Sequence, residues 1–212
     1  MPARHGASSN AVSGGGLFVY SMSKTESIPL PMDVVREALE LDPTSPTWLR
    51  WKTRPRNHFA RNRDWKAWNS QFSGNVAGFE SGGVEGRKYW RVRINYKHYK
   101  AHRLVYALAY GIDPGTMQID HISGDSQNNS PENLRLASNA ENSRNRGKNR
   151  NNTSGRRGVR WMGNRNKWQA QIKINGRACH LGMFTCLDEA AAAYDVAARQ
   201  YFGEFYREEK TK

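Results

Sequence analysis

The chain has 212 residues, with 33 Lys and Arg against 19 Asp and Glu and a formal net charge of +14. This positive balance favours a polyanionic partner, and the hydrophobic content of 37% favours several small cores over one large core. The sequence has no apolar run long enough to span a membrane and no signal-peptide pattern, so we expect a cytoplasmic protein. Cys179 and Cys186 form no Cys-x-x-Cys pair, so neither a structural zinc nor an oxidising compartment is indicated.

The N-terminal residues 1–31 contain Gly and Ser runs without apolar periodicity, which predicts a disordered tail. Residues 32–116 are predicted to form an α+β region. Its apolar pattern predicts a helix over 32–41 with Asp33 as the N-cap, and then a strand over 48–52. The basic insertion 53–70 is interpreted either as a loop or as an arm that contacts DNA.

Three further elements precede the polar centre of the chain. A Gly-rich strand start is predicted at 74–79, and a regular alternation over 89–96 predicts a second strand. A helix is predicted over 101–110, ending at Gly111. His102 in this helix is either a site residue or a hydrogen-bonded structural histidine. The buried face of the second strand is predicted to carry Trp90, Val92, Ile94 and Tyr96.

Residues 117–147 show the order strand, polar loop, strand and helix, with a Ser-x-x-Glu capping box at 138–141 to start the helix. This order is expected to bring four polar side chains together where the strands and the helix meet. They are Asp120, His121, Asn133 and Asn142.

These residue types suit metal-assisted hydrolysis. The carboxylate of Asp120 and the amide oxygen of Asn142 are hard ligands, suited to Mg²⁺ or Mn²⁺ rather than to zinc. The imidazole of His121 can take a proton from water near neutral pH, and Asn133 can accept its other ring N–H. The alternative interpretation is a polar turn between two strands, followed by an ordinary capped helix.

The same stretch resembles the HNH nuclease motif with its ββα-metal fold, in the phage homing-endonuclease branch where Asn replaces the last His. The steps from His121 to Asn133 and on to Asn142 are similar to that branch, as are the Gly-Asp and Asn-Asn pairs in the loop. The resemblance implies one divalent metal, with Mg²⁺ first and Mn²⁺ as the alternative, on Asp120 and Asn142. It also implies that His121 is the general base and that Asn133 orients it.

The following part of the chain is strongly basic, since residues 142–187 hold eleven Lys and Arg and no Asp or Glu. Residues 148–154 are predicted to be a basic linker that can lie along a phosphate backbone. Residues 155–206 predict a compact unit of three strands and one helix, with an Asn-Gly hairpin turn between the second and third strands. The helix is expected over 189–202, with Thr185 as its cap.

This C-terminal unit resembles the APETALA/ethylene-response-factor (ERF) DNA-binding domain, on the motifs Arg-Gly-Val-Arg at 157–160 and Lys-Trp-Gln-Ala at 167–170. In that family the sheet lies in the major groove of DNA. Gln171 and His180 replace the common family residues Glu and Trp, so the base preference does not carry over. Trp168 is interpreted either as a DNA contact or as a core residue. The resemblance implies a DNA-binding face made of Arg157, Arg160, Arg165, Trp168, Gln171, Lys173 and Arg177.

Together these patterns predict an α+β fold. A β-hairpin and helix region precedes a ββα-metal nuclease unit, and a three-stranded antiparallel sheet packed on one helix follows it. We expect a monomeric, metal-dependent, homing-type endonuclease that hydrolyses a phosphodiester bond in double-stranded DNA, with no protein partner. A DNA-binding regulator without catalysis is the alternative, and an RNA-directed protein stays open. Residues 207–212 are predicted to be a charged tail.

Overall fold

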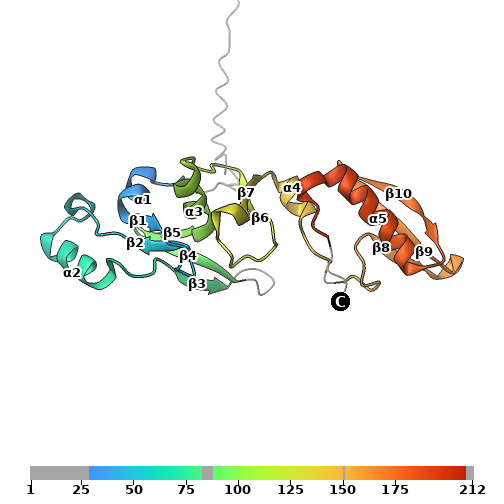
Figure 1. Ribbon diagram of the computed structural model, residues 1–212, viewed down its shortest axis with the longest axis horizontal. Coiled ribbons are helices and arrows are strands. Elements are labelled where there is room, and N and C mark those ends of the chain that lie inside the picture. The colour runs from blue at the N-terminus through green and yellow to red at the C-terminus, as the bar shows by residue number, and fades with distance from the viewer. Residues whose placement is uncertain (1–28, 83–87, 150, 209–212) are drawn as a thin grey trace, which may run out of the picture.

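The computed structural model describes residues 29–82, 88–149 and 151–208. The described elements form a mixed α/β structure with several small sheets, and they fall into two groups at opposite ends of an elongated molecule (Figure 1). Most of the predicted tail lies outside the described residues. Its predicted end is wrong, because Leu30 is buried in the core and its N–H donates to Asp113 Oδ2 at 3.1 Å.

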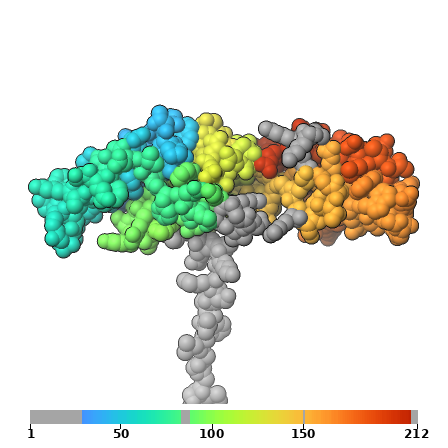
Figure 2. All heavy atoms as spheres, turned by 90° about the horizontal axis from the view of Figure 1, so that it is seen from below, coloured from blue at the N-terminus to red at the C-terminus, as the bar shows by residue number. Residues whose placement is uncertain are grey.

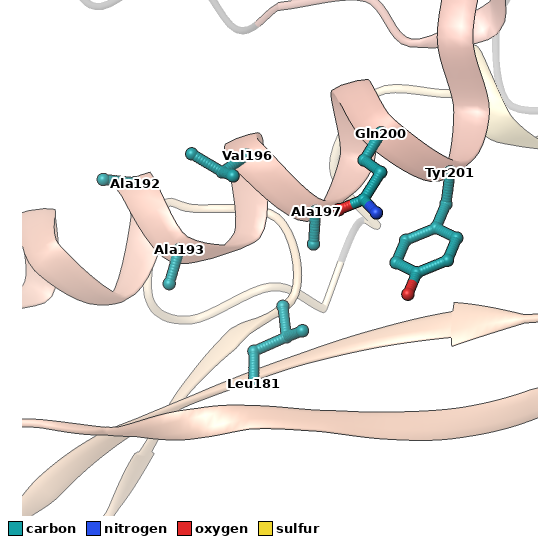
Figure 3. Close-up of a pocket in the computed structure, with 7 residues that line it drawn as sticks. All are labelled: Leu181, Ala192, Ala193, Val196, Ala197, Gln200 and Tyr201. Carbon is teal, nitrogen blue, oxygen red and sulfur yellow. The ribbon is translucent and has the colours of Figure 1, made fainter.

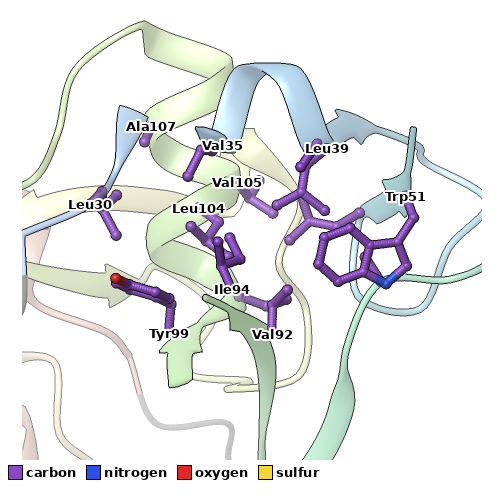
Figure 4. Close-up of a cluster of buried hydrophobic side chains, with 14 of the residues drawn as sticks. Leu30, Val35, Leu39, Trp51, Val92, Ile94, Tyr99, Leu104, Val105 and Ala107 are labelled. Atoms are coloured by element: carbon purple, nitrogen blue, oxygen red, sulfur yellow. The ribbon is translucent and has the colours of Figure 1, made fainter. Parts of the chain in front are cut away.

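The N-terminal group is organised around one helix, α3. The helix predicted over 101–110 is confirmed as α3, and Gly111 ends it with a φ of 72°. Leu104 and Val105 of α3 are fully buried with Val92 and Ile94 of the central strand (Figure 4). Full burial of such a side chain contributes about 1.5–3 kcal/mol, so this contact holds the group together. Its elements are α1 (Met32–Ala38), β1 (Leu39–Leu41), β2 (Leu49–Trp51), α2 (Asn62–Phe72), β3 (Phe79–Gly82), β4 (Lys88–Ile94), β5 (Lys97–Lys100) and α3 (Ala101–Tyr110).

The helix predicted over 32–41 is shorter than expected. It ends at Ala38, and β1 follows directly and pairs antiparallel with β2, with Leu39 opposite Trp51. Leu39 is buried, as its apolar character predicts. An apolar residue suits a buried position in either a helix or a strand, so the pattern alone did not reveal where the helix ends and the strand begins. Asp33 is not the N-cap, because Pro31 holds that position; Asp33 lies in the first turn, where its charge favours the helix dipole.

The insertion 53–70 is largely helical rather than a loop, since it contains most of α2 and a preceding short 3-10 helix, η1 (Arg56–His58). The ring of Trp68 in α2 lies 5.0 Å from that of Trp51 and 5.2 Å from that of Phe72. Trp65 Nε1 donates to Arg54 O at 2.8 Å. Aromatic residues three or four positions apart share one face of a helix, and this signal was present in the sequence. The interpretation as an arm that contacts DNA stays a prediction.

The alternation predicted for 89–96 holds only as far as Ile94, where β4 ends. Tyr96 is 89% exposed instead of buried, because Asn95 and Tyr96 form the turn to β5 with φ values of 47° and 63°. The earlier strand also starts later than expected, since β3 begins at Phe79. The sheet order is β3-β4-β5, with antiparallel pairing throughout.

The centre of the chain forms a hairpin followed by a short helix, and in Figure 2 its yellow atoms lie between the two ends of the molecule. Asp120 and His121 are the last two residues of the first strand instead of following it, and Asp120 stands opposite Arg135. The predicted capping box is confirmed: Ser138 Oγ accepts the Glu141 N–H, and the Glu141 carboxylate accepts the Ser138 N–H. The elements are β6 (Gln118–His121), the 3-10 helix η3 (Pro131–Asn133), β7 (Leu134–Ala137) and α4 (Asn139–Arg144).

The C-terminal group is a sheet of order β10-β9-β8 packed on α5. Gly158 has a φ of 67°, and a Cβ there would lie 2.1 Å from the ring of Tyr194 on α5, so only glycine allows this close packing. The predicted cap is wrong, because α5 begins at Leu187 with Cys186 as N-cap and Thr185 lies outside it. The elements are β8 (Val159–Met162), the 3-10 helix η4 (Gly163–Arg165), β9 (Lys167–Ile174), β10 (Arg177–Phe184), α5 (Leu187–Phe202) and the 3-10 helix η5 (Gly203–Phe205). Within the described ranges, no helix has the length and apolar character needed to cross a membrane.

Candidate active site

The two residues at the end of β6, Asp120 and His121, are both buried, with 3% and 7% of their surface exposed. Successive side chains of a strand point to opposite faces, so each of the two has its own partners. Buried polar groups are costly unless they are hydrogen-bonded. The partners of Asp120 and His121 therefore identify the residues that work with them.

Asp120 is held as a carboxylate from two sides. Arg135 on β7 donates to Asp120 Oδ2 through Nε at 2.9 Å and lies 2.8 Å from the same oxygen through Nη2. Asn145, the C-cap residue of α4, donates through Nδ2 to both carboxylate oxygens at 2.8 and 3.0 Å. Charge-assisted hydrogen bonds of this kind are roughly twice as strong as neutral ones, so the carboxylate is fixed in one orientation.

The expected approach of Asn142 to Asp120 is not formed. Asn142 Nδ2 lies 3.5 Å from Gln118 Oε1, whereas Asn145 contacts the Asp120 carboxylate and donates to His121 O at 2.8 Å. Asn145 is 4% exposed, and its Oδ1 has no hydrogen-bond partner among the described residues. An unsatisfied buried acceptor costs about 1–3 kcal/mol, so a cation at this oxygen would remove a penalty.

A carboxylate and an amide oxygen at this place are ligand types that suit a hard divalent ion, and the Asn145 amide turns its Nδ2 toward Asp120. The described residues contain no group of three or more His, Cys, Asp or Glu that could hold a metal, so a zinc-type site is not seen there. Mg²⁺ instead binds through one or two carboxylates, with waters and phosphate oxygens completing its shell. The Asp120 carboxylate and Asn145 Oδ1 are donors of this type on two side chains in contact.

His121 is a buried imidazole with one fixed nitrogen. Its Nε2 lies 3.3 Å from Oδ1 of Asn129, which is itself 1% exposed. Burial lowers the pKa of His121 below its ordinary value; the Asn129 hydrogen bond and the Asp120 charge oppose this shift, and Lys100 adds to it. A histidine with a lowered pKa is neutral at pH 7, which is the form that accepts a proton.

Asn133 does not reach His121. Its Oδ1 accepts the Ser123 N–H at 2.9 Å and its Nδ2 donates to Asn128 O at 2.7 Å, so it closes the loop that precedes β7. The hydrogen bond to His121 that the sequence predicted for Asn133 is instead made by Asn129 in that loop. The Asn-Asn pair was visible in the sequence, but nothing there indicated which amide faces the imidazole.

Arg135 connects the site to the C-terminal group. Besides its ion pair with Asp120, its Nη1 donates to Glu204 O at 2.7 Å, and its guanidinium carbon lies 4.0 Å from the centre of the Phe205 ring. Arg135 and Asp120 are 13% and 4% exposed at their side chains. Sequence patterns did not predict this contact, because Arg135 and Glu204 are 69 residues apart.

The outer face of the C-terminal sheet carries several of the predicted DNA-binding residues. Ile172 of β9 is buried against α5, so its neighbours Gln171 and Lys173 point to the opposite face. Arg160 of β8 lies on the same outer face, where its Nε donates to Gln169 Oε1 at 2.7 Å. The remaining predicted cations, exposed at or beside the turns that join the strands, are Arg165 and Arg177.

Two of the predicted DNA-binding residues lie elsewhere. Trp168 is on the side of β9 that faces α5, with its ring 4.9 Å from that of Trp161, which supports the core interpretation. The Arg157 guanidinium donates to Arg146 O at 2.8 Å and lies 4.9 Å from the Tyr206 ring centre. Arg157 therefore ties the start of the C-terminal unit to the preceding segment instead of facing outward.

A groove beside α5 lies outside this site (Figure 3). Its lining offers no carboxylate, imidazole or thiol, so hydrolytic chemistry is not expected there. The side chains around it include Leu181, Ala193, Val196, Gln200 and Tyr201.

Asp120, hydrogen-bonded to Arg135 and Asn145, is thus followed in the chain by an imidazole whose pKa is lowered by burial. A family model described as HNH endonuclease matches residues 99–144, the segment that contains Asp120, His121, Asn133 and Asn142. Protein 3.8 of Escherichia phage T7 is 34% identical over 112 residues, which cover 53% of this chain and 92% of that protein. The chain belongs to the HNH endonuclease family.

A second relative is an uncharacterized HNH endonuclease, L560, of Acanthamoeba polyphaga mimivirus. It is 31% identical over 121 residues, which cover 57% of this chain and 62% of that relative. No solved structure matches the chain. Family membership points to nuclease activity on DNA and to use of a divalent metal. These matches do not support the resemblance of the C-terminal unit to the APETALA/ERF domain, since the family model ends at residue 144.

Proposed function

We propose that this protein is a homing-type endonuclease that hydrolyses a phosphodiester bond in double-stranded DNA with one divalent metal, Mg²⁺ or Mn²⁺. The observation that carries the proposal is the pair at the end of β6, where Arg135 and Asn145 hold the Asp120 side chain in one orientation and burial lowers the pKa of His121. The homing-type assignment rests on the phage-type spacing of the motif.

His121 is the general base in this proposal. Asn129 Nδ2 lies 3.4 Å from Thr47 O, which turns Asn129 Oδ1 toward the imidazole. Because that oxygen can only accept, His121 carries its proton on Nε2, and Nδ1 is the basic nitrogen. General-base catalysis contributes about 10²–10⁴-fold in rate.

The metal ligands in this proposal are Asp120 and an amide oxygen of α4. The contacts favour Asn145 over Asn142, because Asn145 lies against the Asp120 carboxylate and has the unsatisfied buried oxygen. When bound, a divalent metal supplies charge stabilisation to the phosphate that is attacked. Products with a 5′ phosphate and a 3′ hydroxyl follow from the family resemblance.

DNA binding is assigned mainly to the C-terminal unit, as a monomer. A sheet can enter the major groove, and Arg160 and Lys173 on the outer face of this sheet can reach phosphates or base edges. The residues 142–187 contain no acid that would repel a phosphate backbone. The likeness to the APETALA/ERF domain is part of this proposal and rests on the sequence motifs.

The test is cleavage of supercoiled plasmid and of host genomic DNA with Mg²⁺, with Mn²⁺ and with EDTA. Metal-dependent nicking or linearisation by the wild type, absent in His121→Ala, is the expected result. Tight DNA binding without cleavage of either substrate would support a regulator without catalysis. Genomic DNA is included because a plasmid can lack the target site.

A further inference from the structure

A second cluster of charged side chains lies beside the active site, on the outer face of the sheet β3-β4-β5. Val92 and Ile94 fill the inner face of β4, so Arg91, the residue before Val92, points to the outer face. In the strand register Arg91 is directly opposite Lys100, the last residue of β5. Two like charges facing each other across neighbouring strands destabilise the pair.

This pair has no anionic partner in the described part of the chain. No side-chain ion pair or hydrogen bond of Arg91 or Lys100 is formed there, and Arg91 Nε is buried without an acceptor. Burial, with the charges of Arg91 and Arg103, lowers the pKa of Lys100. Lys100 is also the N-cap residue of α3, where the helix dipole disfavours a positive charge. Each of these three features reduces the stability of the protein. Residues that reduce stability in this way are found mainly at functional sites, so we expect a functional role for this pair.

The cluster is continuous with His121 through aromatic contacts. Lys100 Nζ lies 5.3 Å from the centre of the Tyr89 ring, and that ring lies 6.0 Å from the ring of His102. The ring of His102 in turn lies 5.0 Å from that of His121. Burial lowers the pKa of both histidines, and the charge of Lys100 adds to the shift in each.

We propose that Arg91 and Lys100 bind a phosphodiester group of the strand that is cut, next to His121. A phosphate at this pair offsets the repulsion between the two cations and complements the positive end of α3. An ordinary solvated basic surface does not account for Arg91, because its Nε is buried away from water. That the anion is DNA rests on the proposed nuclease function; the anion site itself does not.

The test compares two double variants that each remove two positive charges from the same hairpin. Arg91→Met/Lys100→Met removes both charges of the cluster and replaces each side chain by an unbranched apolar one. The matched control is Arg93→Met/Lys97→Met, because Arg93 and Lys97 are exposed residues of the same two strands. A cooperative thermal unfolding transition in each variant ensures that all proteins are compared in the folded state.

The first probe is inorganic phosphate, compared with chloride at equal ionic strength. Phosphate is expected to raise the melting temperature of the wild type and of the control variant, and to have a smaller effect on Arg91→Met/Lys100→Met. An equal shift in all three proteins would overturn the anion site. This probe does not depend on nuclease activity.

The second probe is a duplex that spans the mapped cleavage site, bound in EDTA, with one uncharged methylphosphonate at or beside the scissile position. One such substitution is expected to weaken wild-type binding about tenfold, the scale of one charge-assisted contact. In Arg91→Met/Lys100→Met the same substitution should have no further effect. If every methylphosphonate weakens the wild type and this variant equally, the phosphodiester assignment is wrong. A phosphate effect without any DNA cleavage would instead keep the anion site and reject the nuclease.

Discussion

The active-site centre and the C-terminal unit place their polar groups in opposite ways. The centre buries Asp120, His121, Asn129 and Asn145, whereas no buried polar residue is found within the described residues 151–208. The C-terminal unit buries small apolar side chains between its sheet and α5 and keeps the cations of its sheet on the outside, whereas Arg157 packs against Tyr206. Buried polar groups reduce stability and serve chemistry, while surface cations cost little and serve binding. Changes in the centre should therefore alter rate, and changes in the outer face should alter affinity.

The largest expected effect is on the folding of the C-terminal unit. Gly158→Ala places a methyl group 2.1 Å from the Tyr194 ring, so we expect a loss of unfolding free energy of about 4 kcal/mol or more and a loss of DNA binding. Gly155→Ala is the matched control, because Gly155 also has a positive φ of 75° but nothing lies within 4 Å of its Cβ position. It should cost about 1 kcal/mol. Urea unfolding measures both, and equal losses would show that the close approach of α5 does not hold this unit.

The next effect tests whether the two regions are separate. Arg135→Ala leaves the buried Asp120 carboxylate without its guanidinium and removes the contact with Phe205, so we expect a loss of about 3–5 kcal/mol in unfolding free energy. Glu204→Ala is the control, since it keeps the backbone carbonyl that accepts from Arg135 and removes only a carboxylate that is 76% exposed and lies 3.8 Å from Arg135 Nη1. It should change stability by about 0.5 kcal/mol at most. A neutral Arg135→Ala would mean that the Arg135 contacts do not couple the two regions.

A third comparison separates the two asparagines of α4. Asn145→Ala removes the amide that contacts Asp120, so we expect single-turnover cleavage to fall about 100-fold, with a weaker apparent affinity for Mg²⁺. Asn142→Ala should have an effect below about tenfold, because its side chain makes only a long contact with Gln118. Titration of Mn²⁺ followed by calorimetry gives a second measure. The reverse order of effects would return the ligand role to Asn142.

The smallest effect is on the pH dependence of stability. Burial lowers the pKa of His102 well below its ordinary value, and the pKa of His121 is lowered too. The unfolded state therefore binds more protons, so stability is complete above about pH 6.5 and falls below it by up to about 1.4 kcal/mol per pH unit for each group. His102→Gln should reduce this slope, and the exposed-site variant His98→Gln should leave it unchanged. Urea unfolding at pH 7.5, 6.5 and 5.5 decides between them; equal slopes in wild type and His102→Gln would exclude His102 as a source.

Local patterns were enough to predict the parts of the site that depend on neighbouring residues. The capping box at Ser138 and Glu141, the helix ended by Gly111 and the hydrophobic inner face of β4 each depend on residues a few positions apart. The pair Asp120 and His121 was also identified, because it stands within an extended motif that resembles the HNH nucleases. In the central segment of the chain, the order of strand, loop, strand and helix was therefore the feature of the sequence that predicted most of the site.

Side-chain direction and long-range contacts were not accessible in the same way. Asn142 and Asn145 are almost one helical turn apart, and which of them meets Asp120 depends on how α4 rotates against β6. The contact of Arg135 with Phe205 joins segments that are far apart in the sequence, and no local sequence pattern predicts it. Trp168 is different, because the alternation of apolar residues in β9 already predicted that its side chain faces the core. The family resemblance instead suggested a DNA contact.

The most direct test of the division between chemistry and binding uses one DNA duplex and three proteins: the wild type, His121→Ala and Arg160→Ala/Lys173→Ala. Binding is measured in EDTA over a range of salt, and single-turnover cleavage is measured in Mg²⁺ at saturating protein. We predict that His121→Ala loses about 10²–10⁴-fold in rate with unchanged affinity. The double variant should bind more weakly, with a salt slope reduced by about 0.9 for each phosphate that it no longer neutralises, and should cleave at the wild-type rate once saturated. Wild-type cleavage by His121→Ala, or a slower saturated rate with unchanged affinity in the double variant, would contradict this division.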